Sequence, residues 1–99
     1  MKSGIYMILN HKSSWCYIGA SKDLDLRRKS HFTKTSNRFL NMSMSSYGKN
    51  SFSFDILENV DVVDLRKRED WWIKRAISDG VNLYNDVKDS RYALTGFDR

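Results

Sequence analysis

Glu69 is the residue whose position in the chain most clearly predicts a functional role. Winding residues 62–77 as an α-helix gathers an apolar stripe on one face, and Glu69 falls in the middle of it. The apolar members of the stripe are Val62, Leu65, Trp72, Ile73 and Ala76. A carboxylate on a buried face is costly unless it is paired, protonated or bound to a metal. We therefore expect Glu69 to bind a metal ion or to pair with Arg66 or Lys67.

Two tyrosines are predicted to stand side by side on one face of a β-hairpin. Alternating apolar residues and a run of aromatic and β-branched residues predict the two strands, over residues 4–10 and 15–19. A two-residue turn formed by His11 and Lys12 would place Tyr6 opposite Tyr17, within contact distance across the strands. The same register places Ile8 opposite Trp15. The alternative is that both tyrosines are ordinary strand aromatics.

A helix rich in cations is predicted directly after the hairpin. Ser21 or Asp23 can cap it, and it runs to about residue 32. It contains few apolar residues, so we expect one face to be exposed. The residues that share a common side of this helix are Arg27, His31 and Lys34.

The positive charge of the chain is concentrated in its first half. The net charge is +5, and residues 1–54 contain nine lysines and arginines against two acids, whereas residues 55–99 contain eight against ten. A basic half on a small domain predicts a polyanionic partner such as DNA, and the alternative is an ordinary solvated surface. The candidate DNA-binding residues are Lys22, Arg27, Arg28, Lys29, Lys34 and Arg38.

The middle of the chain predicts a second short helix and a third strand. Asn37 can cap the helix, and Gly48 is a plausible stop for it. Apolar residues then alternate with polar ones over residues 52–57, which is typical of a strand.

The last predicted element is the long helix that carries Glu69. It starts at Asp61 or Asp64 and ends at Gly80. Residues 81–85 form a short apolar segment that can dock on the core. We expect one α/β (α+β) domain over residues 1–86, followed by a polar C-terminal tail over residues 87–99.

The composition limits the setting in which the chain works. No apolar run is long enough to span a membrane, and the N-terminus has no signal-peptide pattern, so no membrane partner is expected. Cys16 is the single cysteine, which excludes an internal disulfide and fits a reducing, cytoplasmic location.

Two tripeptides carry a resemblance to a known family. The sequence Gly4-Ile5-Tyr6, followed by Tyr17-Ile18-Gly19 at hairpin spacing, resembles the GIY-YIG nucleases. The resemblance continues through Arg27 and His31 to Glu69 and Asn85, and its first part is most like the catalytic domain of phage homing endonucleases. It implies a small three-stranded antiparallel sheet flanked by helices. It also implies a DNA endonuclease that uses Mg²⁺ or Mn²⁺, encoded by a phage or working in a bacterial host.

The resemblance also implies a role for each residue of the motif. Glu69 would hold the metal, and Tyr6 would orient or deprotonate the attacking water, although a free tyrosine titrates near a pKa of about 10. Tyr17 would assist Tyr6 or contact the phosphate. Arg27 would stabilise charge on the phosphoryl oxygens, because its planar fork matches them.

Supporting roles follow in the same way. His31 would share a proton with Tyr6 or bind phosphate, and it could instead simply cover the sheet. Asn85 would support the site by hydrogen bonding, or it could be a turn residue. Gly4 and Gly19 complete the two tripeptides. Arg28 is a rival for the role of Arg27, which is favoured because it lies one helical turn before His31.

The sequence also departs from the family pattern. Some homing relatives have a second histidine where this chain has Thr35, Ser36 and Asn37, and some have a lysine where Leu26 stands. These differences affect the path of the proton. Homing enzymes also attach this domain to a DNA-recognition segment, so we expect a homodimer or an attached or partner recognition module.

Two other functions fit the same sequence. One is a non-catalytic DNA-binding module that uses the fold as a phosphate clamp. The other is a small subunit that works inside a larger nucleoprotein assembly. A pure DNA binder has no need of a carboxylate beside a phosphate, so the combination of Glu69 with Tyr6 and Arg27 favours the endonuclease.

Overall fold

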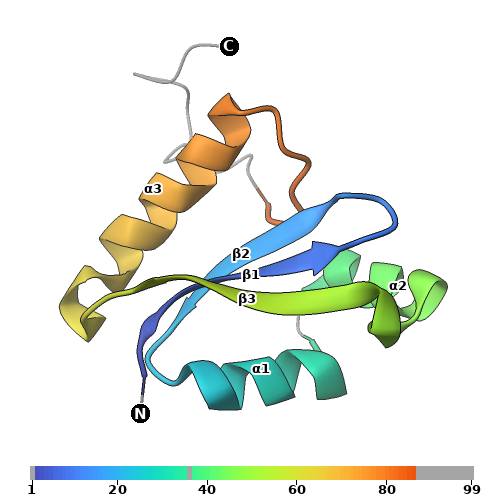
Figure 1. Cartoon of the computed structure of the whole chain (residues 1–99), viewed down its shortest axis with the longest axis horizontal. Helices are drawn as coiled ribbons and strands as arrows, with labels where there is room; N and C mark the ends of the chain where they lie inside the picture. Colours follow the sequence, from blue (N-terminus) through green and yellow to red (C-terminus); the bar gives the residue numbers. More distant parts are fainter. Residues whose placement is uncertain (1, 36, 87–99) are drawn as a thin grey trace.

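A three-stranded antiparallel sheet forms the centre of the computed structural model, which describes residues 2–35 and 37–86 (Figure 1). The strand order is β2-β1-β3, so β1 is the central strand. The strands are β1 (Gly4–Asn10), β2 (Cys16–Ser21) and β3 (Phe52–Asn59). The helices are α1 (Leu24–Thr33), α2 (Arg38–Tyr47) and α3 (Leu65–Ser78), with short 3₁₀ turns η1 (Lys49–Ser51) and η2 (Val62–Asp64). The predicted α+β class, with helices flanking a three-stranded antiparallel sheet, is confirmed.

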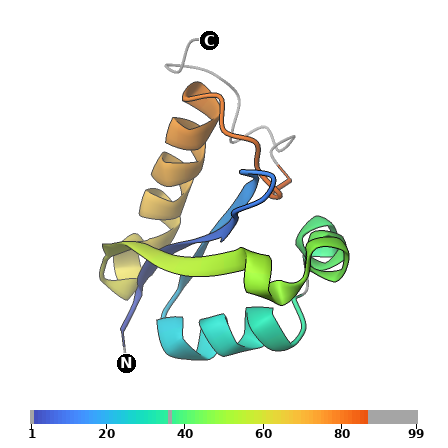
Figure 2. The same cartoon turned by 45° about the vertical axis from the view of Figure 1, so that its right-hand side comes forward.

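Each face of the sheet packs against its own helices, because neighbouring residues in a strand point to opposite faces. Ile5 joins Ile73 of α3 in one apolar cluster. Tyr6 points the other way and joins Leu24 of α1 and Leu40 of α2 in a second cluster. Figure 2 shows α3 on one side of the sheet, with α1 and α2 on the other. The alternation in β1 therefore assigns Tyr6 to the face that α1 covers.

The predicted register of the hairpin is wrong by two residues. Tyr6 pairs with Gly19 rather than with Tyr17, and Ile8 pairs with Tyr17 rather than with Trp15. Because side chains alternate with a period of two, this shift leaves every side chain on its predicted face. Tyr6 and Tyr17 are consequently diagonal neighbours, with ring centroids 6.2 Å apart.

A longer turn explains the shift in register. The Asn10 side chain accepts hydrogen bonds from the backbone N–H groups of Lys12 and Ser13, which stabilises a four-residue turn. Ser14 completes the turn in the left-handed region, with φ 67°. The backbone N–H of Asn10 then donates to the carbonyl of Trp15, which sets the register of both strands.

The two helices below the sheet begin and end as the sequence predicts. Asp23 caps α1 by accepting from the Leu26 N–H, and Asn37 caps α2 by accepting from the Leu40 N–H. Gly48 ends α2 with φ 84°, a conformation that favours glycine. Helix α1 buries only Leu24 and His31, so most of its surface faces solvent.

The last helix starts later than its apolar stripe suggests. Residues 62–64 form the 3₁₀ turn η2, and α3 begins at Leu65. A 3₁₀ turn has three residues per turn, so Val62 loses the phase of the stripe and is 58% exposed. Glu69 lies among the apolar residues of α3 but is only half-buried, which corrects the prediction of a carboxylate on a buried face.

The segment after α3 docks on the edge of β2, as predicted. The Cys16 N–H donates to the Asn82 carbonyl, and the Tyr84 N–H donates to the Cys16 carbonyl. Leu83 forms a parallel bridge to Cys16, and Tyr84 is buried. The predicted polar tail over residues 87–99 lies outside the described residues.

Cys16 is buried at the start of β2, and this burial raises the pKa of its thiol to about 11, so it carries no thiolate at neutral pH. No helix among residues 2–35 and 37–86 is long and apolar enough to cross a bilayer.

Asn10→Ala should destabilise the fold strongly. Asn10 is fully buried, and its side-chain amide also donates to Ser43 and Tyr84, so the substitution leaves buried partners unsatisfied. We expect the free energy of unfolding, measured by urea denaturation, to fall by about 1–3 kcal/mol or more. Lys12→Ala, in the same turn but exposed, should change it by no more than about 0.5 kcal/mol. Equal effects of the two substitutions would contradict this account of the turn.

Candidate active site

The hydroxyl of Tyr6 lies in hydrogen-bonding contact with a histidine beneath the sheet. Tyr6 Oη is 2.7 Å from Nε2 of His31, which α1 projects toward β1. Both side chains are buried, with 0% of Tyr6 and 5% of His31 exposed. Tyr17 of β2 lies against the same imidazole, with ring centroids 5.4 Å apart. Three residues that the motif separates by up to 25 positions therefore meet at one point.

The glycines of the two tripeptides make room for this arrangement. Gly19 lies opposite Tyr6, and a Cβ on it would stand 2.3 Å from the Tyr6 hydroxyl oxygen. A Cβ on Gly4 would stand 2.3 Å from the carbonyl oxygen of Glu58, next to an irregularity where β1 pairs with β3. The phenol of Tyr6 can therefore lie flat against β2 only because position 19 has no side chain.

A small hollow opens beside the buried tyrosine–histidine pair. It has a volume of about 300 Å³ and lies between β2 and the outer side of α1. The residues that line it are Tyr17, Arg27, Ser30, His31, Lys34 and Thr35. Two cations, two hydroxyl groups, a phenol and an imidazole around a concave surface suit a phosphate group.

Burial and charge set the protonation states of the site. Burial raises the pKa of Tyr6 far above its ordinary value, and the neighbouring Tyr17 adds to this, whereas Arg27 acts in the opposite direction. Burial also lowers the pKa of His31 to about 4, helped by the positive charge of Arg27. At neutral pH the pair is therefore a neutral phenol hydrogen-bonded to a neutral imidazole, and a neutral imidazole can accept a proton.

Glu69 reaches the same site from α3. After burial, its negative charge is the main factor that raises the pKa of Tyr17, and it contributes to the raised pKa of Tyr6. The carboxylate therefore lies within electrostatic range of both hydroxyl groups.

The donors around Glu69 fit a hard divalent cation. Mg²⁺ is usually held in enzymes by one or two carboxylates, with water and substrate phosphate oxygens as the other ligands. The Glu69 carboxylate, within electrostatic range of two phenol hydroxyl groups, is an oxygen donor of the kind that such a site uses. No group of three or more His, Cys, Asp or Glu side chains in the described ranges could enclose a metal, so the protein contribution would come mainly from Glu69.

Asn85 supports β2 at the level of the tyrosine. Its side-chain Oδ1 accepts from the Ile18 N–H at 2.9 Å, and its Nδ2 donates to the Ile18 carbonyl at 2.7 Å. Ile18 stands between Tyr17 and Gly19, so this one amide fixes the strand that presents both. Asn85 itself is not among the residues that line the hollow.

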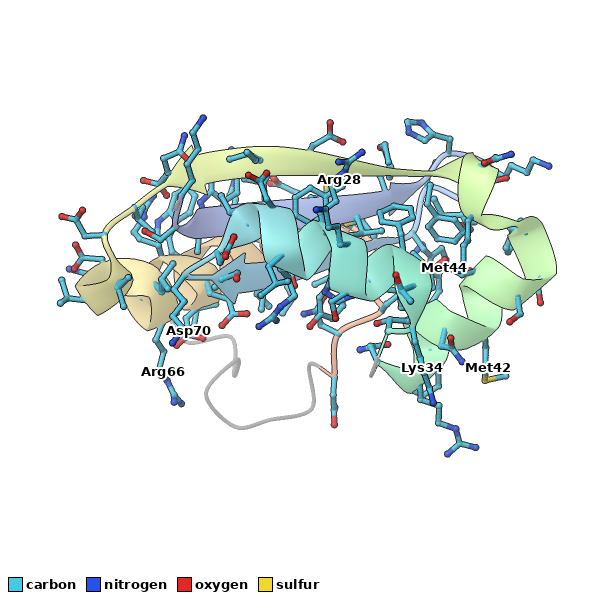
Figure 3. All side chains as sticks on the ribbon, turned by 90° about the horizontal axis from the view of Figure 1, so that it is seen from below. Arg28, Lys34, Met42, Met44, Arg66 and Asp70 are labelled. Atoms are coloured by element: carbon cyan, nitrogen blue, oxygen red, sulfur yellow. The ribbon has the colours of Figure 1, made fainter. Side chains whose placement is uncertain are left out.

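The structure separates the predicted DNA-binding cations into groups. Arg27 and Lys34 line the hollow, whereas Arg28 and Lys29 line a larger groove between α1 and β3 that also contains Lys49. Figure 3 views α1 from outside and shows Arg28 on the side toward β3 and Lys34 on the other side. Arg28 is therefore in the wrong place to replace Arg27. Two predicted cations are exposed but line neither cavity: Lys22 and Arg38.

Two residues that are not among the predicted site residues contact Tyr6 and His31. Phe54 of β3 stacks on Tyr6, with centroids 4.7 Å apart and planes 17° apart. Thr35 is buried, and its Oγ1 lies 3.0 Å from Nδ1 of His31. Only its spacing of four residues from His31 could have predicted this contact from the sequence. That spacing is weak evidence, because Thr35 follows the end of α1.

This combination of side chains defines a class of enzyme. A buried hydroxyl linked to a neutral base, an arginine at a concave surface and a nearby carboxylate are groups that can serve phosphodiester hydrolysis. A sequence model of the GIY-YIG catalytic domain matches residues 2–85, and the chain belongs to this nuclease family. Members of the family generally use a divalent metal ion.

Similar proteins agree with this assignment. The chain is 36% identical over 102 residues to intron-associated endonuclease 1 of Enterobacteria phage T4. That match covers 96% of this chain and 40% of the relative, so the chain spans less than half of the relative's length. The catalytic domain of homing endonuclease I-TevI superposes with a TM-score of 0.73 and 32% identity, covering 86% of this chain and 100% of that domain. A glutamate-to-alanine mutant of the same catalytic domain gives a TM-score of 0.72 and 34% identity, covering 83% and 91%.

Gly19→Ala should displace Tyr6. The added methyl group would overlap the phenol ring and hydroxyl, and the surrounding strands leave little room for either to move. We expect a loss of about 1–3 kcal/mol in the free energy of unfolding and a changed near-ultraviolet circular dichroism signal. A variant with native stability and an unchanged spectrum would show that Tyr6 does not depend on this contact.

Proposed function

We propose that this chain is the catalytic part of a DNA endonuclease that hydrolyses phosphodiester bonds with the help of a divalent metal ion. The hydrogen bond between Tyr6 and the neutral His31, beside Arg27, is the observation that carries this proposal. It supports base catalysis at a phosphate, which a module that only binds DNA does not need. The family membership supports the same conclusion.

The proposed reaction begins with transfer of a proton through the buried pair. The oxygen of Tyr6 accepts a proton from the attacking water while the phenol proton passes to Nε2 of His31. The resulting hydroxide forms a bond to phosphorus, and the bond from phosphorus to the leaving sugar oxygen breaks. The leaving oxygen takes a proton from solvent, and the imidazolium returns its proton to solvent. The imidazolium is short-lived, because burial and Arg27 both disfavour it.

Arg27 and Tyr17 would hold the phosphate during this reaction. The guanidinium of Arg27 can donate two parallel hydrogen bonds to non-bridging phosphate oxygens, which carry the developing charge. Tyr17 lines the hollow with a hydroxyl group that can donate to the same phosphate. Burial raises the pKa of Tyr17, and the charge of Glu69 reinforces this, so Tyr17 stays protonated at neutral pH and acts as a donor.

Glu69 would hold the metal ion, and Mg²⁺ is the cation that its oxygen donor suits best, with Mn²⁺ as the close alternative. A bound divalent cation would neutralise charge on the phosphate and on the leaving oxygen. The position of Glu69, within electrostatic range of both tyrosines, supports this role.

The DNA would extend beyond the hollow along α1. We propose that Arg28 and Lys29 contact backbone phosphates on the second side of this exposed helix, with Lys22 just before α1 and Arg38 at the start of α2 as further contacts. Backbone contacts position DNA but do not read its sequence. Recognition would therefore come from a homodimer or from an attached or partner module. The phage relative supports a role in the cytoplasm of a bacterial host.

Glu69→Gln should abolish cleavage without weakening DNA binding. Glutamine keeps the shape of the side chain but removes the charge that holds the cation, so nicking of supercoiled plasmid with Mg²⁺ should fall about 100-fold or more. DNA affinity in a gel-shift assay should be unchanged or higher, because a negative charge is removed. Asp79→Asn, at the end of the same helix and exposed, is the matched control and should cut normally.

The same plasmid assay separates the alternatives. Cleavage by the unmodified chain with Mg²⁺, but not with EDTA, would establish the endonuclease. A retained gel shift with no cleavage under any divalent cation would point to a binding module or a subunit of a larger assembly. Equal loss of binding and cleavage in Glu69→Gln would contradict the metal-binding role.

Arg28→Ala combined with Lys29→Ala should weaken DNA binding but not turnover. Removing one cation from a backbone phosphate lowers the slope of log affinity against log salt by about 0.9 for duplex DNA, so the pair should lower it by up to about 1.8. Cleavage at saturating DNA should stay near normal, whereas Arg27→Ala should lower it. Lys12→Ala combined with Lys67→Ala removes the same charge from the hairpin turn and from α3, away from α1, and should leave the slope nearly unchanged.

A further inference from the structure

Both ring nitrogens of His31 have partners. Nε2 faces the Tyr6 hydroxyl at 2.7 Å, and Nδ1 faces Oγ1 of Thr35 at 3.0 Å. A neutral imidazole has one proton, so one nitrogen is a donor and the other is an acceptor. His31 can accept a proton from Tyr6 only in the tautomer that leaves Nε2 bare. The partner of Nδ1 therefore decides whether the pair can work as a relay.

Thr35 is held firmly in place at the junction between α1 and α2. It is 6% exposed, and its Oγ1 also accepts the backbone N–H of Asn37 at 3.3 Å. Asn37 in turn caps α2 through the N–H of Leu40. A hydroxyl oxygen has two lone pairs. Accepting from Asn37 leaves Thr35 one lone pair and its own proton, so the distances decide its role toward the imidazole. The 3.0 Å from Oγ1 to Nδ1 is typical of an N–H donor, whereas the 2.7 Å from Tyr6 Oη to Nε2 is typical of a hydroxyl donor, so Thr35 is favoured as the acceptor from Nδ1.

The opposite arrangement would block transfer of a proton from Tyr6 to His31. If the Thr35 hydroxyl donated to Nδ1, the Nε2–H of His31 would have to donate to the Tyr6 oxygen. Burial raises the pKa of Tyr6 and keeps it protonated, so its own proton would then be directed away from the imidazole. The short contact between Tyr6 and His31 would remain, but no proton could move from the phenol to His31.

We propose that Thr35 is a positioning residue whose Oγ1 accepts the Nδ1–H of His31 and thereby keeps Nε2 free to accept the proton of Tyr6. This inference rests on the proposed function for its consequence in catalysis, but the tautomer itself is a property of the folded protein. Thr35 acts through His31 and does not take part in proton transfer itself. A hydroxyl group in this chain performs the orienting task that backbone carbonyls and carboxylates perform for many catalytic histidines.

The first test measures the tautomer directly by ¹⁵N NMR of the imidazole. His11→Gln, in an exposed turn, leaves His31 as the single histidine, and long-range ¹H–¹⁵N spectra of this variant then report each ring nitrogen separately. We expect Nδ1 to be protonated and Nε2 to be bare at neutral pH, without metal or DNA. A protonated Nε2 would overturn the proposal, whether or not the protein proves to be a nuclease.

The second test changes Thr35 in the same background. Thr35→Val keeps the shape but removes the acceptor, so the population with a protonated Nε2 should rise. Thr35→Ser keeps the hydroxyl group and should retain the original tautomer. The same tautomer in all three proteins would show that Thr35 does not control it. The spectrum of the parent protein decides the tautomer even if the valine variant folds poorly.

Cleavage measurements then test the consequence. Thr35→Val should lower turnover about 10- to 100-fold, with the DNA concentration at half-maximal rate nearly unchanged, and Thr35→Ser should recover most of the rate. A serine variant as slow as the valine variant, although native in its tautomer and melting temperature, would contradict the positioning role. Absence of cleavage in the parent protein, together with the expected tautomer, would count against the proposed function and not against the role of Thr35.

Discussion

The enclosure of one phenol group organises this structure. Tyr6 lies on the central strand with 0% of its side chain exposed, and its ring belongs to the apolar cluster between the sheet and the two lower helices. A hydroxyl group buried this deeply needs a hydrogen-bond partner. His31 supplies it, so α1 has to lie where its imidazole can reach β1. The glycine opposite Tyr6 and the stacked Phe54 follow from the same requirement.

This constraint gives His31 two tasks. Helix α1 contributes little apolar surface to the core, with only Leu24 and His31 buried along its length. The histidine therefore holds the helix against the sheet with the same contact that we assign to proton transfer. Chemistry and packing cannot be varied separately at this position. The exposed remainder of α1 is free to carry cations on two sides, and this is where the positive charge of the first half of the chain is displayed.

The sequence predicts most of the fold, because its elements have strong local signals. The caps Asp23 and Asn37 and the stop at Gly48 act within a few residues of the positions they control. The hairpin register is harder to predict from the sequence, because it depends on the hydrogen bonds that the buried Asn10 side chain forms with the turn. The error had no effect on the site, because a shift of two residues preserves the faces of a strand.

The parts of the site that the sequence could not reveal depend on contacts between distant or weakly patterned elements. Thr35 follows the end of a helix, where a polar residue is common. Its importance to the site comes from its contact with the imidazole of His31, which only the folded structure shows. The helical phase that would place Val62 in the apolar stripe is interrupted by the 3₁₀ turn. Glu69 fits the stripe on a helical wheel, yet it is only half-buried, because a helical wheel gives the direction of a side chain and not how closely the sheet approaches it.

The amide of Asn85 has an effect on how this protein can associate. A sheet edge with free N–H and carbonyl groups is a template on which a strand from another molecule can add. Strand β2 is such an edge, and it also carries Tyr17. The backbone of residues 82–84 forms hydrogen bonds with the main-chain groups of Cys16, and the Asn85 side chain does so with those of Ile18. The Asn85 amide therefore makes the two hydrogen bonds that a fourth strand would otherwise make at Ile18. A foreign strand could pair beside Tyr17 only after displacing Asn85, and this keeps the reactive edge of the sheet out of non-specific aggregation.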